Sequence, residues 1–212
     1  MIIARKQRRG RGRSEREWFS PVGGLWFSLV LRPRAPTWPT SLLPIAAGVS
    51  TARTIRRVFR LGAVLKWPND VMIGTRKIAG ILTESSIRGN NYCAIIGFGV
   101  NVNNSYVSVP NTLRNKVTSL YDLTKSRVNV EWLMQENLKE FVQIYTKMFA
   151  GRQAEIVTEW KRLTLMLGKQ ITVCEGDTSF KAVAVDLDSD GALVVRTENG
   201  ALRRLLSASI LL

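Results

Sequence analysis

The sequence predicts an α+β fold, in which helices pack on a β-sheet and a small β-barrel follows at the C-terminus. Apolar residues recur every three or four positions in three long segments, which is typical of amphipathic helices. Short apolar runs bounded by Gly, Pro, Asn and Asp lie between the helices and indicate strands. After Gly168 only short strands split by turn signals remain, and about 45 residues of this kind suggest a small barrel.

The first elements are expected to be two strands, a loop and a helix. Residues 1–4 and 25–31 indicate strands, and residues 5–17 form an Arg- and Gly-rich loop between them. Over residues 41–59 the apolar positions recur at helical spacing, and Ser41 is the expected N-cap.

Four further strands are expected after this helix, two of them joined by a hairpin turn. Residues 63–67 indicate a short strand that ends before a proline. Residues 71–73 and 77–83 are expected to pair through a Gly-Thr turn. Residues 92–102 are apolar on both faces, which predicts a central strand.

The second half begins with two helices. Residues 130–149 are expected to be helical, with Asn129 as the cap. The next helix has inward-facing residues from Ile156 to Leu167, with Gly168 as its stop signal. In the C-terminal region, residues 199–200 (Asn-Gly) predict a type I′ hairpin turn.

The composition excludes several kinds of site. The chain of 212 residues contains no histidine, which excludes Ser-His-Asp triads, His-Cys pairs and His-ligated zinc. Cys93 and Cys174 lie in separate strand-like segments that fit neither a metal site nor a disulfide framework. No apolar run reaches the roughly 18 residues of a membrane span, and no secretory signal is evident. We therefore expect a cytoplasmic protein without a membrane partner.

Positive charge is concentrated near the start of the chain. Of a net charge of +15, 11 units fall in residues 1–60, where 13 basic residues face only Glu15 and Glu17. Such a block indicates contact with phosphate groups, nucleic acid or an anionic membrane, or else a transit peptide. The two motifs described next favour phosphate.

The first motif is Lys66-Trp67-Pro68-Asn69-Asp70, followed by Lys77 on the returning strand. A carboxylate, an amide and two lysines should therefore converge at one end of a sheet. A purely structural interpretation carries equal weight from these residues alone. In it, Asp70 pairs with Lys66 or Lys77, and Asn69 shapes the turn.

The second motif runs from Gln7 to Trp18 and contains Gly10-Arg11-Gly12-Arg13. Arginines between glycine hinges make a mobile cationic loop that can close over a polyphosphate with bidentate hydrogen bonds. Arg-Gly tracts also bind RNA, so a nucleic-acid-binding module built on residues 5–16 is an alternative.

Together the two motifs resemble the biotin–protein ligase family, and the match covers nearly the whole chain. The matching segments are residues 7–13, 18–21, 66–70, 77–82 and 97–101. The resemblance implies a catalytic domain of the class II synthetase-like type, with a mixed sheet and packed helices, over residues 1–166. It also implies an SH3-like domain over residues 167–212. A lipoate– or octanoate–protein ligase of the same fold is the alternative, but Trp67-Pro68 and the arginines favour biotin.

The resemblance also implies roles for individual residues. Biotin and biotinyl-adenylate would be bound by Gln7, Gly10, Arg11, Gly12, Arg13, Lys77 and Gly80. ATP would be bound by Trp18, Lys66, Asn69, Asp70 and Asn101. Lys77, Arg13 and Asp70 would be catalytic, and no residue is assigned as a direct metal ligand.

The implied activity is that of a biotin–[acetyl-CoA-carboxylase] ligase. Biotin and ATP, with Mg²⁺ as cofactor, would form biotinyl-5′-AMP. Biotin would then pass to a lysine of a biotin carboxyl carrier protein or carboxylase domain. No enzyme nucleophile is needed, which agrees with the lack of histidine.

Two departures from the family affect the start of the chain. Family members carry a biotin-binding Ser-Thr-Asn segment before the arginine motif, so we expect this chain to be truncated at its N-terminus. No helix-turn-helix precedes the catalytic region. The chain therefore resembles the monofunctional ligases of the family, and we expect no DNA-binding domain in it. Within the loop, Glu15 stands where family members usually carry glycine.

Overall fold

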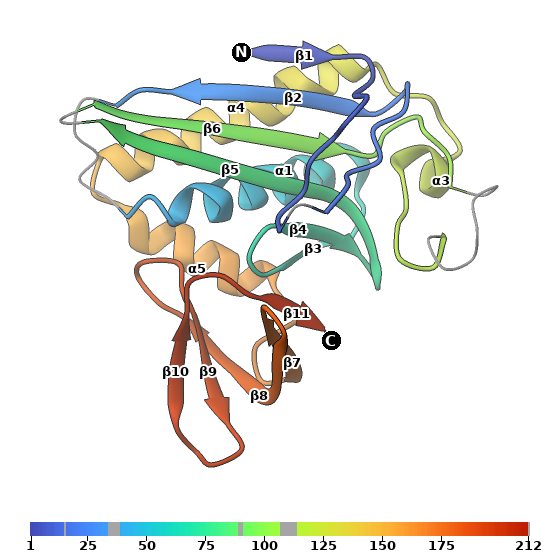
Figure 1. Ribbon diagram of the computed structural model, residues 1–212. Coiled ribbons are helices and arrows are strands. Elements are labelled where there is room, and N and C mark those ends of the chain that lie inside the picture. The colour runs from blue at the N-terminus through green and yellow to red at the C-terminus, as the bar shows by residue number, and fades with distance from the viewer. Residues whose placement is uncertain (15, 34–38, 89–90, 107–113, 212) are drawn as a thin grey trace.

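A six-stranded sheet forms the centre of the protein (Figure 1). The computed structural model describes residues 1–14, 16–33, 39–88, 91–106 and 114–211, so Glu15 lies outside it. The strands are β1 (Ile2–Ala4), β2 (Leu25–Leu31), β3 (Ala63–Lys66), β4 (Asp70–Ile73), β5 (Arg76–Arg88) and β6 (Asn91–Val100). Their order is β1-β2-β6-β5-β4-β3, which confirms the central position predicted for β6.

Pairing in this sheet is antiparallel between all the described neighbouring strands. Parallel pairing is limited to isolated bridges, Leu65 with Thr164 and Lys77 with Val117. The α+β class is confirmed, with a sheet more uniformly antiparallel than the mixed sheet expected. Short connections explain this for β3 to β6, because consecutive antiparallel strands need only a tight turn such as the one at Gly74 between β4 and β5.

Helices cover one face of the sheet (Figure 1). They are α1 (Leu42–Phe59), α4 (Val130–Phe149) and α5 (Gln153–Leu163), with the short α3 (Leu120–Thr124) at one end. Aromatic rings join the sheet to α4, since Phe27 and Phe98 stack at 4.5 Å and Phe98 meets Phe141 edge-on at 5.6 Å. The opposite face is left for the segment between β1 and β2, which runs across it in Figure 1. The short α3 was not predicted.

The helix caps agree only in part with the prediction. The Asn129 side chain accepts a hydrogen bond from the Trp132 N–H, as expected of an N-cap. Ser41 precedes α1 but does not cap it, because its backbone is already helical, with φ −60° and ψ −19°. Its hydroxyl donates instead to the carbonyl of Asp190 in the C-terminal region.

The end of α5 corrects the sequence prediction. The helix ends at Leu163, before the predicted stop at Gly168, so Leu167 lies outside it. Thr164 adopts an extended conformation, and its hydroxyl donates a 2.8 Å hydrogen bond to the carbonyl of Leu65. This contact with β3 ends the helix at this point. It joins two residues that are far apart in sequence, so no local sequence pattern could predict it.

The C-terminal region is a second antiparallel sheet, which confirms the predicted β-rich end of the chain. Its strands are β7 (Gln170–Glu175), β8 (Thr178–Leu187), β9 (Leu193–Thr197), β10 (Leu202–Leu205) and β11 (Ser209–Leu211), in the order β10-β9-β8-β7-β11. The hairpin at residues 199–200 is present, but type I′ is wrong. That turn needs positive φ at both central residues, and only Gly200 has it, with φ 83°.

The two sheets meet next to the start of α1. Trp67 Nε1 donates a 3.1 Å hydrogen bond to the carbonyl of Gly191, and Leu42 packs against the same glycine. This contact attaches the C-terminal sheet directly behind the Lys66–Asp70 turn. Of the helices in the described ranges, none is long and apolar enough to cross a membrane.

Candidate functional site

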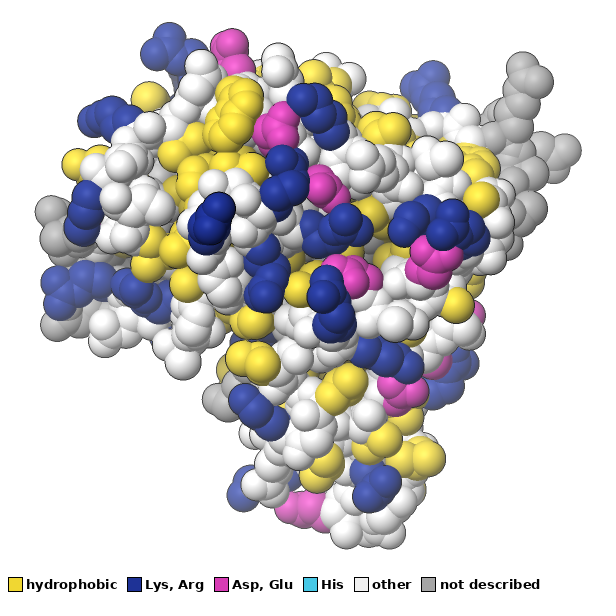
Figure 2. Space-filling model, turned by 180° about the vertical axis from the view of Figure 1, so that it is seen from behind, with side chains coloured by type: hydrophobic (Ala, Val, Ile, Leu, Met, Phe, Trp, Pro, Cys, Tyr) yellow, Lys and Arg dark blue, Asp and Glu magenta, His cyan; other side chains and the backbone are white. Residues whose placement is uncertain are grey.

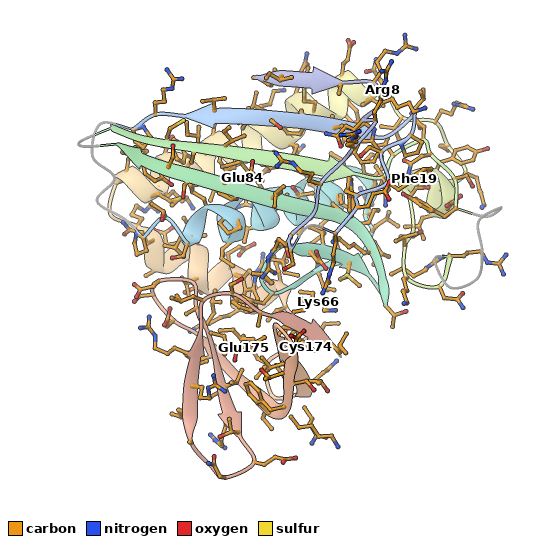
Figure 3. All side chains as sticks on the ribbon, in the orientation of Figure 1. Arg8, Phe19, Lys66, Glu84, Cys174 and Glu175 are labelled. Carbon is orange, nitrogen blue, oxygen red and sulfur yellow. The ribbon has the colours of Figure 1, made fainter. Side chains whose placement is uncertain are left out.

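A cavity of about 890 Å³ lies between three parts of the chain. One wall is formed by part of the arginine loop, residues 5–17 apart from Glu15, and another by the strands of the central sheet, β1 to β6. Residues 208–211 of the C-terminal sheet close the third side. Figure 3 shows Lys66 at the foot of the central sheet, above Cys174 of β7. Most of the residues predicted from sequence line this cavity: Gln7, Arg11, Gly12, Arg13, Trp18, Lys66, Asn69, Asp70, Lys77 and Gly80.

The Lys66–Asp70 turn and β5 bring the predicted polar groups together. Lys66 and Asp70 are cross-strand partners, and Lys77 Nζ lies 2.5 Å from Asp70 Oδ1. Asn69 is fixed against β5, because its Nδ2 donates to the carbonyl of Ile81 at 2.7 Å. The pairing of Asp70 with Lys77 that the sequence left open is therefore present, within the wall of a cavity.

Positive charge exceeds negative charge around Asp70. Burial lowers the pKa of Lys66, and the nearby charges of Lys77 and Arg16 lower it further, against the opposing effect of Asp70. Burial likewise lowers the pKa of Arg13, again opposed by Asp70. In both cases the loss of solvent outweighs the attraction of Asp70, the nearby carboxylate. The cluster is therefore suited to bind an anion.

The arginine loop is folded back on itself and fastened to the C-terminal sheet. The Gly12 N–H donates to the carbonyl of Arg16 at 2.7 Å, which closes the tip of the loop. Arg13 donates to Ser207 Oγ at 2.8 Å and to the carbonyl of Ala208 at 3.1 Å. Arg16 donates to Ser209 Oγ at 2.9 Å.

Ser207 and Ser209 were missed by the sequence analysis. They lie more than 190 residues from the arginines that they bind, and no local pattern marks them. Ser20 was missed as well. Its buried hydroxyl donates to Gln7 Oε1 at 2.5 Å, and this bond fixes the side chain predicted to bind biotin.

Two glycines form the floor under Trp18. Gly80 and Gly99 are direct partners on β5 and β6. A Cβ atom at Gly99 would lie 2.6 Å from Trp18 Nε1, and one at Gly80 would lie 3.0 Å from Lys77 Cε. Lys77 Nζ is 4.8 Å from the centroid of the Trp18 ring. Trp18 Nε1 is buried and has no hydrogen-bond partner among the described residues, so it is available to a ligand acceptor.

Two predicted residues lie outside the cavity lining. Gly10 is buried against the carbonyl of Trp18, where a Cβ atom would lie only 2.2 Å away, so it allows the loop to pack. Asn101 donates to the carbonyl of Thr118 at 3.0 Å and accepts from the Tyr106 hydroxyl at 2.9 Å. Tyr106 itself lines the cavity, and burial raises its pKa to about 12. Asn101 therefore supports the wall through Tyr106.

The chain matches two protein families. Residues 1–101 match the biotin/lipoate A/B protein ligase family, and residues 166–212 match the biotin protein ligase C-terminal domain. The bifunctional ligase/repressor BirA of Bacillus spizizenii is 31% identical over 212 residues. That alignment covers 99% of this chain, and the chain spans only 65% of the relative's length.

Two further proteins resemble the chain over most of their own length. The biotin–[acetyl-CoA-carboxylase] ligase of Paracoccus denitrificans is 29% identical, over 94% of this chain and 85% of that protein. A solved structure of the biotin protein ligase from Aquifex aeolicus, in complex with biotin and ATP, superposes with a TM-score of 0.84. It is 27% identical, and the alignment covers 99% of this chain and 86% of that one.

Proposed function

The chain belongs to the biotin–protein ligase family, and from this premise we propose that it joins biotin to a lysine of a carrier protein with the energy of ATP. The observation that carries the proposal is the surplus of cations around Asp70. Arg13, Lys66 and Lys77 surround one carboxylate in a half-buried cavity. Both substrates of the first step are anions, since biotin reacts at its carboxylate and ATP reacts within its triphosphate.

The proposed first step forms biotinyl-5′-AMP. A carboxylate oxygen of biotin attacks the α-phosphorus of ATP, the bond from that phosphorus to the bridging oxygen breaks, and pyrophosphate leaves with the electron pair. Negative charge accumulates on the phosphoryl oxygens, and preorganised Lys and Arg donors stabilise it. Lys77 and Arg13 are the catalytic donors in this proposal, because both reach the cavity beside Asp70.

In the proposed second step the ε-amine of the carrier lysine attacks the acyl carbon of the adenylate. The bond from that carbon to the phosphate oxygen breaks, AMP leaves, and the new amide nitrogen loses a proton to solvent. The enzyme supplies no nucleophile in either step, which fits a chain without histidine. Gln7, Arg11, Gly12 and Gly80 would hold biotin and the adenylate, and Trp18, Lys66 and Asn69 would hold the nucleotide.

Mg²⁺ is proposed to arrive with the ATP phosphates. The described residues contain no group of three or more Asp, Glu, Cys or His that could hold a metal alone. Asp70 Oδ1 receives no hydrogen bond of good geometry, although Lys77 lies close to it. The Asp70 carboxylate and the side-chain oxygen of Asn69 could provide two ligands to a cation that takes its other ligands from phosphate and water. When bound, Mg²⁺ would neutralise phosphate charge.

The domain division and the location of the protein belong to the same proposal. We place the catalytic domain at residues 1–166 and an SH3-like domain at residues 167–212, which supplies Ser207 and Ser209 to the arginine loop. A cytoplasmic location, where a carboxylase carrier would be met, stays a prediction.

The proposal is tested by labelling a biotin carboxyl carrier domain with purified chain, ATP, Mg²⁺ and biotin. We expect one biotinyl group on one carrier lysine, and none when ATP or biotin is left out. The same assay with lipoate or octanoate separates the two acyl classes. Transfer of lipoate without transfer of biotin would contradict the proposal.

A further inference from the structure

The chain directly after β1 carries five basic residues with no acidic residue among them. They are Arg5, Lys6, Arg8, Arg9 and Arg11, and all five side chains are exposed. Of these, only Arg11 makes an ion pair within the described part of the chain. It lies 3.6 Å from Glu84, and both partners are more than half exposed. Exposed ion pairs of this kind contribute little to stability. Nearly all of the positive charge of the segment is therefore uncompensated.

The other exposed cations in the described ranges are compensated only in part. On the helical side, Arg53 and Arg57 of α1 lie against Glu140 and Glu136 of α4. Figure 2 views the molecule from behind and shows some Lys and Arg side chains next to acidic ones and others with no acidic side chain beside them. Residues 5–9 stand out by density, because four of these five residues are basic and none of the four makes an ion pair within the described part of the chain.

The segment divides its side chains between the cavity and the surface around it. Gln7, Arg9 and Arg11 line the cavity, whereas Arg5, Lys6 and Arg8 do not. Figure 3 shows Arg8 beside the end of β1, the edge strand opposite to β3, which carries Lys66. Lys6 and Arg8 flank Gln7, which lines the cavity, so these exposed cations lie beside the cavity and not within its lining.

We propose that Arg5, Lys6 and Arg8, here called the basic rim, dock an acidic face of the carrier protein that presents the acceptor lysine. This inference rests on the proposed function. The carrier lysine has to enter the cavity, so the carrier surface next to it has to meet whatever surrounds the opening. Like charges placed opposite one another at an interface cost several kcal/mol, and complementary charges accelerate encounter. A carrier suited to this rim is therefore negatively charged around its lysine.

A nucleic acid is the competing occupant for such a segment, and the structure favours a protein. The rim is three side chains long and borders a cavity that already takes up Arg9, Arg11 and Arg13. Nucleic-acid binding at physiological salt draws on several phosphate contacts along a basic surface, about six to ten in strong cases. A basic rim of three side chains beside a reaction cavity is better matched to a compact acidic patch on a protein than to a run of phosphates on a nucleic acid.

The test removes the rim charge in the full chain and measures the two half-reactions separately. The variant carries Arg5→Gln, Lys6→Gln and Arg8→Gln together. The matched control carries Lys169→Gln, Lys181→Gln and Arg196→Gln, three exposed cations of the C-terminal region that do not line the cavity. Biotinyl-adenylate formation is followed without carrier. Transfer from preformed adenylate is followed to an acidic biotin carboxyl carrier domain and, separately, to hydroxylamine, a small neutral nucleophile.

We expect the rim variant to form adenylate and to react with hydroxylamine like the wild type. Its kcat/KM for the carrier should fall about tenfold at low salt, within the range by which charge steering changes association rates. The deficit should largely vanish near 1 M salt, where the screening length is about 3 Å. The control variant should keep the wild-type kcat/KM for the carrier.

Two results would overturn the docking proposal. One is equal carrier kinetics for the rim variant, the control variant and the wild type. The other is loss of binding to a short single-stranded oligonucleotide by the rim variant, with carrier kinetics unchanged. Failure of the wild type to form any biotinyl-adenylate is a different result, because it would contradict the proposed function and not the role of the rim alone.

Discussion

Lys77 Nζ lies 2.5 Å from Asp70 Oδ1 and 4.8 Å from the ring of Trp18, at the point where the strands and the arginine loop meet. This lysine therefore contacts both a carboxylate and an aromatic face, with its side chain about one quarter exposed. Both contacts hold the ammonium group at the cavity wall. A group fixed in this way pays little to reorganise when a phosphate arrives, which is the condition for electrostatic catalysis.

Replacing Lys77 with alanine should remove most adenylate formation. A fixed ammonium against a developing phosphate charge is worth roughly 10²–10³ in rate. Lys77→Arg should restore only part of the activity, since a planar fork does not reproduce a point donor. Single-turnover formation of biotinyl-adenylate measures both variants, with circular dichroism as the control for folding. Wild-type rates in Lys77→Ala would reduce the residue to a structural role.

Lys66 should link activity and stability in opposite directions. Burial lowers its pKa below the usual 10.5, so the folded protein holds this proton less tightly than the unfolded chain. Below the folded-state pKa the buried charge costs stability, and this cost is removed as the pH rises through that pKa toward the unfolded value. Lys66→Met should therefore raise the free energy of unfolding at neutral pH while lowering adenylate formation.

The pH profile separates this effect from simple repacking. The stability difference between Lys66→Met and the wild type should shrink at alkaline pH, and urea titrations across pH measure it. A difference that stays constant up to pH 10 and beyond would mean that the charge of Lys66 is not its cause.

Gly99 should tolerate no side chain while Trp18 is present. A Cβ atom at position 99 would lie 2.6 Å from Trp18 Nε1, so Gly99→Ala has to displace the indole. We expect ATP or biotin to bind roughly tenfold more weakly, which corresponds to about 1.4 kcal/mol. Isothermal calorimetry on the variant measures this loss, and Gly62→Ala is the control, because nothing lies within 4 Å of a Cβ atom there.

A double variant identifies the cause of that loss. If displacement of Trp18 is the mechanism, Trp18→Ala with Gly99→Ala should bind no more weakly than Trp18→Ala alone. Full additivity of the two losses would show that Gly99 acts through some other contact.

Ser207 should hold the arginine loop closed against the C-terminal sheet. Ser207→Ala removes the 2.8 Å hydrogen bond from Arg13 but leaves the bond to the Ala208 carbonyl. A net loss of about 0.5–1.5 kcal/mol should raise trypsin cleavage at Arg11 and Arg13 roughly 2- to 10-fold. Saturating biotinyl-adenylate should restore protection, because the phosphate then engages the arginines. Ser179→Ala, at an exposed position of β8, should leave cleavage unchanged.

The sequence was most informative where one local pattern decided the structure. The helix over residues 42–59 and the strand over residues 25–31 follow from apolar spacing, and both are confirmed. The convergence of Asp70 and Lys77 also follows locally, since a tight hairpin brings them together. By contrast, Thr164 ends α5 through a bond to a residue 99 positions away.

The same physical limit explains what was missed in the site. Ser207 and Ser209 reach the arginines only because the C-terminal sheet folds back onto the loop, and no periodicity encodes that contact. Asn101 belongs to a recognisable motif, yet its side chain bonds to Thr118 and Tyr106, and of these three residues only Tyr106 lines the cavity. A motif identifies residues that belong together, whereas long-range packing decides which of them face the ligand.

The central claim is that the cavity joins biotin to the α-phosphate of ATP before any carrier is involved. The most direct measurement is the exchange of labelled pyrophosphate into ATP by the purified chain, with biotin and Mg²⁺ present and no carrier protein. We predict exchange that requires biotin and that Lys77→Ala lowers roughly 10²- to 10³-fold. No exchange with biotin, or exchange supported by lipoate or octanoate alone, would contradict the account.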